Sequence, residues 1–149
     1  MPPIDPLVDS LRKWTEIFMH RSMRNFIRYA RESGLSMSQL GALFHIQHGI
    51  SGVTDLGEDI GITNAAASQM LERLVQMQLI QRSEDPHDRR VKQIVLTDKG
   101  QTVIQESIHA RQRWFGDLAG TLSEGEKVQI VSALKILVEK ANRLDISPE

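Results

Sequence analysis

The residues best suited to chemistry in this sequence are a set of small and amide side chains between positions 63 and 73. A helix capped by Thr63 would place its apolar residues on one side and the following residues on the other: Asn64, Ala65, Ser68, Gln69, Glu72 and Arg73. Small side chains allow close approach to another surface, and the amides of Asn and Gln can pair with the edges of DNA bases. This segment is therefore a candidate for reading the major groove.

A second candidate group lies at the tip of a predicted hairpin. Residues 79–82 and 91–96 have the composition of two paired strands, and Asp85-Pro86 favours a turn between them. The tip and the strand after it carry the following polar residues: His87, Asp88, Arg89, Arg90 and Lys92. An arginine at such a tip can enter the DNA minor groove, and Asp88 could orient it through a charge-assisted hydrogen bond. Because acids accompany the cations here, a solvated hairpin with internal salt bridges is the alternative.

Other residue patterns argue against an enzyme. The sequence has no nucleophile elbow, no phosphate-cradling glycine loop and no convincing pair of carboxylates. His45 and His48 share a side of a predicted helix, but two histidines without a third ligand more often serve packing than metal binding. We therefore predict no catalytic activity, no metal site and no cofactor.

Composition indicates one ordinary globular domain. The chain has 149 residues, of which 40% are hydrophobic and 25% charged, and it has no cysteine for disulfides or thiol redox chemistry. It has no apolar run of membrane-spanning length and no recognisable signal peptide, so we expect a cytoplasmic protein. The formal net charge of -1 means that any affinity for DNA must come from locally placed basic groups.

Helices must position both candidate groups. Asp5-Pro6 predicts the start of a helix that Gly34 ends, Ser36 or Ser38 can cap a second helix, and residues 53–60 form a short third helix before the turn at Gly61. The first helix ends in a run of arginines, either a solvated face or an anion-facing stripe: Arg21, Arg24, Arg28 and Arg31. A fifth helix from residue 98 to about 118 and a last one after Ser123 are strongly apolar. Their apolar surface predicts a dimer interface, although they could instead complete the monomer's own core.

The predicted fold class is mainly α with a small β-hairpin wing, an α+β winged helix-turn-helix. Residues 1–149 are expected to form a single domain. Within it, residues 36–97 would form the DNA-binding lobe, and residues 5–34 and 98–145 would form helices for dimerisation.

The segment DRRVKQIVLTDKG, Asp88 to Gly100, resembles the wing signature of the MarR (multiple antibiotic resistance regulator) family, and the resemblance extends from about residue 7 to 143. It implies a homodimer on a pseudo-palindromic operator of double-stranded DNA, with each recognition helix in a major groove and each wing in a minor groove. The resemblance assigns DNA contacts to Thr63, Asn64, Ala65, Ser68, Gln69, His87, Asp88, Arg89 and Arg90, with Ser38 and Gln39 near the phosphate backbone. Two residues depart from the pattern: Gln69 stands where many relatives have Arg or Lys, and Gln78 where glycine is common.

The family resemblance also implies regulation by a small aromatic or anionic effector that releases a repressor from DNA. The residues expected to line its site are Arg12, Trp14, Phe18, His20, Arg21, Phe44 and His48, although core packing explains the aromatic ones equally well. A dimeric protein-interaction module of the same fold that has lost or weakened DNA binding is the alternative function. Gln69 and the net charge of -1 both keep that alternative open.

Overall fold

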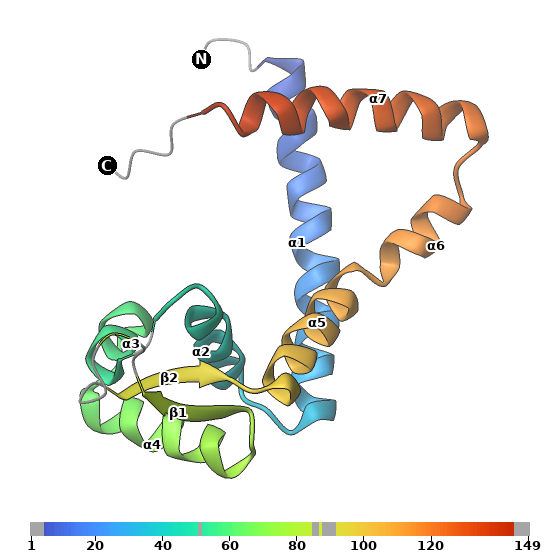
Figure 1. The fold of residues 1–149 in the computed structure, drawn as a ribbon. Coiled ribbons are helices and arrows are strands. Elements are labelled where there is room, and N and C mark those ends of the chain that lie inside the picture. The colour runs from blue at the N-terminus through green and yellow to red at the C-terminus, as the bar shows by residue number, and fades with distance from the viewer. Residues whose placement is uncertain (1–4, 51, 85–86, 88–91, 145–149) are drawn as a thin grey trace. The chain divides into compact units, whose positions relative to one another are not determined.

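The computed structural model describes residues 5–50, 52–84, 87 and 92–144, and the chain divides into two compact units (Figure 1). The first unit, Met1–Gln112, contains α1 (Pro6–Ser33), α2 (Met37–Gln47), α3 (Val53–Ile60), α4 (Asn64–Gln76), β1 (Ile80–Glu84), β2 (Lys92–Leu96) and α5 (Asp98–Gln112). The second unit, Arg113–Glu149, contains α6 (Trp114–Gly120) and α7 (Glu124–Ala141). A mainly helical chain with one antiparallel hairpin confirms the predicted fold class.

Local capping explains where the first helices begin and end. The Asp5 carboxylate accepts a hydrogen bond of 2.7 Å from the Leu7 N–H, and Gly34 ends α1 in the left-handed conformation with φ 70°. The cap of α2 is Ser36 rather than Ser38. The Ser36 hydroxyl accepts from the Gln39 N–H at 3.1 Å, and the Gln39 side chain accepts from the Ser36 N–H at 2.9 Å, which completes a capping box.

The core of the first unit joins all five of its helices, α1 to α5, to the hairpin. Its most deeply buried side chains are Leu40, Leu43, Leu56, Leu74, Leu79, Ile80, Ile104 and Ser107. α1 packs against α5, as Figure 1 shows, and the Tyr29 hydroxyl joins them by donating to the Val103 carbonyl at 3.1 Å and to the Glu106 carboxylate at 3.0 Å. Burial, together with the neighbouring Glu106, raises the pKa of Tyr29 to about 12. These contacts hold α1 and α5 together within the first unit.

The helix predicted from residue 98 to about 118 is in fact two helices. α5 ends at Gln112 and α6 begins at Trp114, although Arg113 between them keeps right-handed helical angles (φ -49°, ψ -38°). Because the boundary between the two units falls at this point, the two helices belong to different compact bodies.

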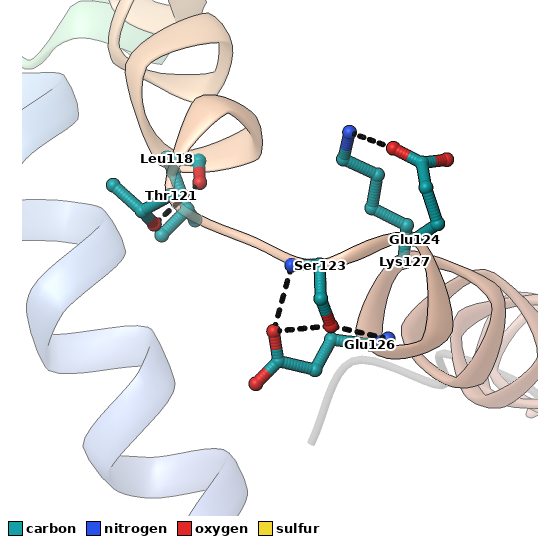
Figure 2. A network of polar contacts seen from close by, with 6 residues as sticks. All are labelled: Leu118, Thr121, Ser123, Glu124, Glu126 and Lys127. Atoms are coloured by element: carbon teal, nitrogen blue, oxygen red, sulfur yellow. Dashed lines mark hydrogen bonds and ion pairs between the residues drawn. The ribbon is translucent and has the colours of Figure 1, made fainter.

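The second unit ends in a helix with an apolar surface. Figure 2 shows its start, where the Ser123 N–H and hydroxyl each donate to the Glu126 carboxylate at 2.8 Å and the Glu126 N–H donates back to the hydroxyl at 3.3 Å. The backbone bond from Ser123 lowers the pKa of Glu126. None of the described residues of α7 is buried, and the large apolar side chains that it exposes are Val128, Ile130, Val131, Leu134, Ile136 and Val138. Within the described residues, none of the helices has the length and apolarity that crossing a bilayer requires.

Candidate nucleic-acid interface

The turn between α3 and α4 is closely packed. Gly61 adopts a left-handed conformation with φ 75°, and the Ile62 N–H donates to the Gly57 carbonyl at 2.9 Å. A Cβ atom on Gly57 would lie 3.1 Å from the Ile62 carbonyl oxygen, closer than nearly all real Cβ contacts. Thr63 then caps α4 by accepting from the Ala66 N–H at 3.2 Å. The predicted helix-turn-helix is therefore confirmed, including its cap.

The two faces of α4 separate as the sequence predicts. Ala67, Leu71 and Leu74 are buried against the core. The exposed face carries Asn64, Ala65, Ser68, Gln69, Glu72 and Arg73. Glu72 lies 3.8 Å from the Arg82 guanidinium of the hairpin, a loose ion pair between exposed side chains. This face presents small and amide groups to solvent at the start of the helix and a cation near its end.

The turn after α4 adopts the left-handed backbone conformation, although residue 78 is glutamine and not glycine. Gln78 has φ 60°, its N–H donates to the Val75 carbonyl at 2.8 Å, and the Leu79 N–H donates to the Leu74 carbonyl at 3.0 Å. A left-handed non-glycine residue costs of the order of 1 kcal/mol, so surrounding contacts must hold it in place.

The hairpin supports the predicted tip, but most of the tip lies outside the described residues. β1 and β2 pair antiparallel, from Ile80 opposite Leu96 to Glu84 opposite Lys92. His87 is described and exposed. The predictions for Asp88, Arg89, Arg90 and the Lys92 side chain fall outside the described part of the structure.

At the start of α2, Ser38 is exposed and Gln39 is half-buried, with its side-chain oxygen engaged in the capping box. The carboxamide nitrogen of Gln39 is not used by this box. Ser38 and Gln39 thus keep donors for the predicted phosphate contacts.

The two histidines weighed as metal ligands make polar contacts within the fold. His45 Nδ1 lies 2.7 Å from the Asp59 carboxylate and links α2 to α3, while His48 Nδ1 lies 2.7 Å from the Phe44 carbonyl oxygen. Among the described residues, there is no group of three or more His, Cys, Asp or Glu side chains that could hold a metal ion.

The residues predicted to line an effector site lie in two regions. Arg12, Trp14, His20 and Arg21 are exposed on α1 and Phe18 is half-buried there, whereas Phe44 and His48 belong to α2 and its C-terminal cap. Phe44 lies 5.2 Å from the Arg111 guanidinium, which stacks 3.8 Å over Phe26. Trp14 is twelve residues before Phe26, or about 18 Å along the helix.

Arg111 is a functional candidate that the sequence analysis did not single out. Its Nε atom is buried without a hydrogen-bond partner among the described residues, and burial lowers the pKa of its guanidinium. The sequence signal for Arg111 was its spacing from Ile104. A residue seven positions later lies on the same side of α5, and Ile104 is buried.

Comparisons with known proteins show which family this chain resembles. The model of the MarR family matches residues 35–92, which span α2, α3, α4 and the hairpin. The HTH-type transcriptional repressor MdtR of Bacillus subtilis (strain 168) is 25% identical over 142 residues, which cover 95% of this chain and 92% of MdtR. Residues 35–92 of this chain thus match the MarR family.

Solved structures confirm the fold of this chain. The transcriptional regulator Tm0710 of Thermotoga maritima has a TM-score of 0.76 at 23% identity, with 93% of this chain and 95% of that chain covered. A mutant of S. aureus MepR bound to an oligodeoxyribonucleotide has a TM-score of 0.65 at 21% identity, with 88% and 97% covered. MdtR is a transcriptional repressor, which agrees with the prediction that the chain is not an enzyme.

Proposed function

We propose that this chain is a sequence-specific MarR-family regulator of transcription that binds double-stranded DNA as a homodimeric repressor. The observation that carries the proposal is the exposed face of α4, where Asn64 and Gln69 offer amides between small side chains. Paired amide hydrogen bonds suit the major-groove edge of adenine. The repressor name of MdtR and the oligodeoxyribonucleotide bound to a MepR mutant support the same function.

The dimer is proposed from the apolar surface of the terminal helices. On α7, Val131, Leu134 and Val138 follow each other at intervals of three and four residues, so they form one stripe, and each is at least 47% exposed. α1 exposes a comparable set: Leu7, Val8, Leu11, Trp14, Ile17, Met19, Met23 and Ile27. A second copy related by a two-fold axis would cover such surfaces and would give two recognition helices for two half-sites.

Dimerisation is tested by sedimentation equilibrium of the full chain. Leu134→Glu places a charge in the α7 stripe and should shift the protein toward monomer. Ser132→Glu is the matched control, since Ser132 lies on the other side of α7 and is exposed. A wild-type monomer at micromolar concentration would contradict the proposed dimer.

DNA binding is tested with a duplex that the purified protein selects from a random library. We expect Asn64→Ala to reduce discrimination at one base pair per half-site by about 1–3 kcal/mol. Gln76→Ala is the matched control, because Gln76 is an exposed amide at the opposite end of α4. Equal weakening on all sequences would show that Asn64 positions the protein instead of reading bases.

The salt dependence of binding separates the regulator from a protein-interaction module of the same fold. With a net charge of -1, phosphate contacts must come from local cations such as Arg73 and Arg90, the arginine predicted for the wing tip. Arg90→Ala should lower the slope of log affinity against log salt by about one for each phosphate that the arginine neutralises. A dimer that does not bind duplex DNA even at low salt would favour the protein-interaction module over the regulator.

We further propose that a small aromatic or anionic effector releases the repressor by favouring a protomer arrangement that mismatches the two half-sites. Arg12 and Arg21 on α1 are the proposed carboxylate partners. Benzoate is the simplest probe, and it should weaken DNA binding of the wild type more than that of Arg21→Gln. Equal weakening of both would remove Arg21 from the proposed site.

A further inference from the structure

The end of the recognition helix α4 is held by residues at the start of α5. The Lys99 ammonium donates to the Met77 carbonyl at 2.9 Å, and the Thr97 hydroxyl donates to the Gln78 carbonyl at 2.6 Å. The Thr97 N–H donates to the Leu79 carbonyl at 3.1 Å. Three consecutive carbonyls after α4 therefore each receive a donor from the segment Thr97 to Lys99.

These contacts satisfy groups that a helix cannot satisfy by itself. The last carbonyls of a helix have no partners within it, and they carry the negative end of its dipole, which a cation stabilises. They also surround Gln78, whose left-handed backbone (φ 60°) needs external support. The ammonium of Lys99 is thus directed at the helix end and not only at solvent.

The backbones themselves are in close contact at this point. A Cβ atom on Gly100 would lie 2.0 Å from the Leu79 carbonyl oxygen, and Leu79 and Ile80 are 1% and 2% exposed. α5 in turn packs against α1. The position of α4 is therefore tied to the α1–α5 pair through a short and densely packed junction.

We infer that Lys99 is a positioning residue for DNA recognition: acting through the Met77 carbonyl, it fixes the orientation of α4 relative to α5. This inference rests on the proposed DNA-binding function. It separates Lys99 from the other cations between residues 79 and 99, because Lys99 contributes geometry rather than a phosphate contact. Without this ammonium, the orientation of the amide face of α4 is less fixed. Recognition of the bases then weakens, while attraction to the DNA backbone is unchanged.

The first test needs no DNA. Hydrogen exchange of the amides in residues 73–80 should be about fivefold faster in Lys99→Met. This variant keeps the apolar stem of the side chain but removes the ammonium that donates to the Met77 carbonyl. Lys99→Arg keeps a cationic donor and should restore the wild-type rate. Lys140→Met removes one exposed charge from the side of α7 opposite the Val131 stripe and is the control for net charge. Unchanged exchange in Lys99→Met overturns the inference whether or not the chain binds DNA.

The second test compares the selected duplex with a scrambled duplex of equal length at several salt concentrations. We expect Lys99→Met to lower affinity for the selected duplex by about fivefold, with the salt slope and the affinity for the scrambled duplex unchanged. A fall in slope of about one per protomer would make Lys99 a phosphate contact and overturn the inference. Equal loss on both duplexes would indicate a destabilised lobe and overturn it as well. If the wild type selects no duplex, the proposed function fails, while the exchange test still decides whether Lys99 holds the end of α4.

Discussion

Replacement of Gly100 by alanine should destabilise the fold through one atomic contact. The added Cβ would lie 2.0 Å from the Leu79 carbonyl oxygen, whereas ordinary van der Waals contact begins at 3.4 Å. The obstructing atom is backbone next to a buried side chain, so it cannot rotate away. The first turn of α5 must instead move outward by about 1.4 Å.

That displacement has a predictable size in free energy. It breaks the hydrogen bond of 3.1 Å from the Thr97 N–H to the Leu79 carbonyl and strains the bond of 2.6 Å from Thr97 to Gln78. Overpacking costs about 1–3 kcal/mol and each broken hydrogen bond about 1 kcal/mol, partly offset by the better helix propensity of alanine. We expect unfolding free energy to fall by about 3 kcal/mol and Tm by about 9 °C.

Urea unfolding and thermal denaturation at fixed protein concentration measure the effect. Gly41→Ala is the matched control, because Gly41 lies within α2 and no described atom lies within 4 Å of its added Cβ. It should raise the unfolding free energy by about 0.5–1 kcal/mol. If Gly100→Ala proves as stable as Gly41→Ala, the close approach of α5 to Leu79 is refuted.

Three further predictions concern stability and its dependence on pH. Burial and a neighbouring carboxylate raise the pKa of Tyr29 to about 12. The protonated hydroxyl therefore contributes its full stabilisation of the fold below pH 10, and this contribution is lost between pH 10 and 12. In urea unfolding, the stability difference between the wild type and Tyr29→Phe should shrink over that range. Arg111→Met removes a half-buried cation but keeps contact with Phe26, so it should match the wild type within about 1 kcal/mol, whereas Arg111→Ala should lose about 2 kcal/mol. Equal losses would mean that the charge itself stabilises. Ser36→Ala should cost about 1 kcal/mol and Ser38→Ala less than about 0.5 kcal/mol, since Ser36 caps α2; the reverse order by thermal denaturation would contradict this assignment.

Local features of the fold were predictable from sequence. Asp5, Thr63 and Ser123 cap the helices expected of them, and the apolar and amide faces of α4 follow from its periodicity. Each of these features depends on hydrogen bonds or spacing within a few residues. The amide face of the candidate DNA interface belongs to this class.

Tertiary structure decided the features that join distant parts of the chain. Lys99 reaches the carbonyl of Met77, 22 residues earlier, and Arg111 of α5 lies over Phe26 of α1. The sequence shows two ordinary surface cations at these positions, because neither partner is near in the chain. Helix packing alone brings such groups together. It also allows Gln78 to hold a left-handed backbone conformation, which favours glycine. The chemistry of the α4 face is thus determined by residues close together in sequence, while the direction in which that face points depends on long-range packing.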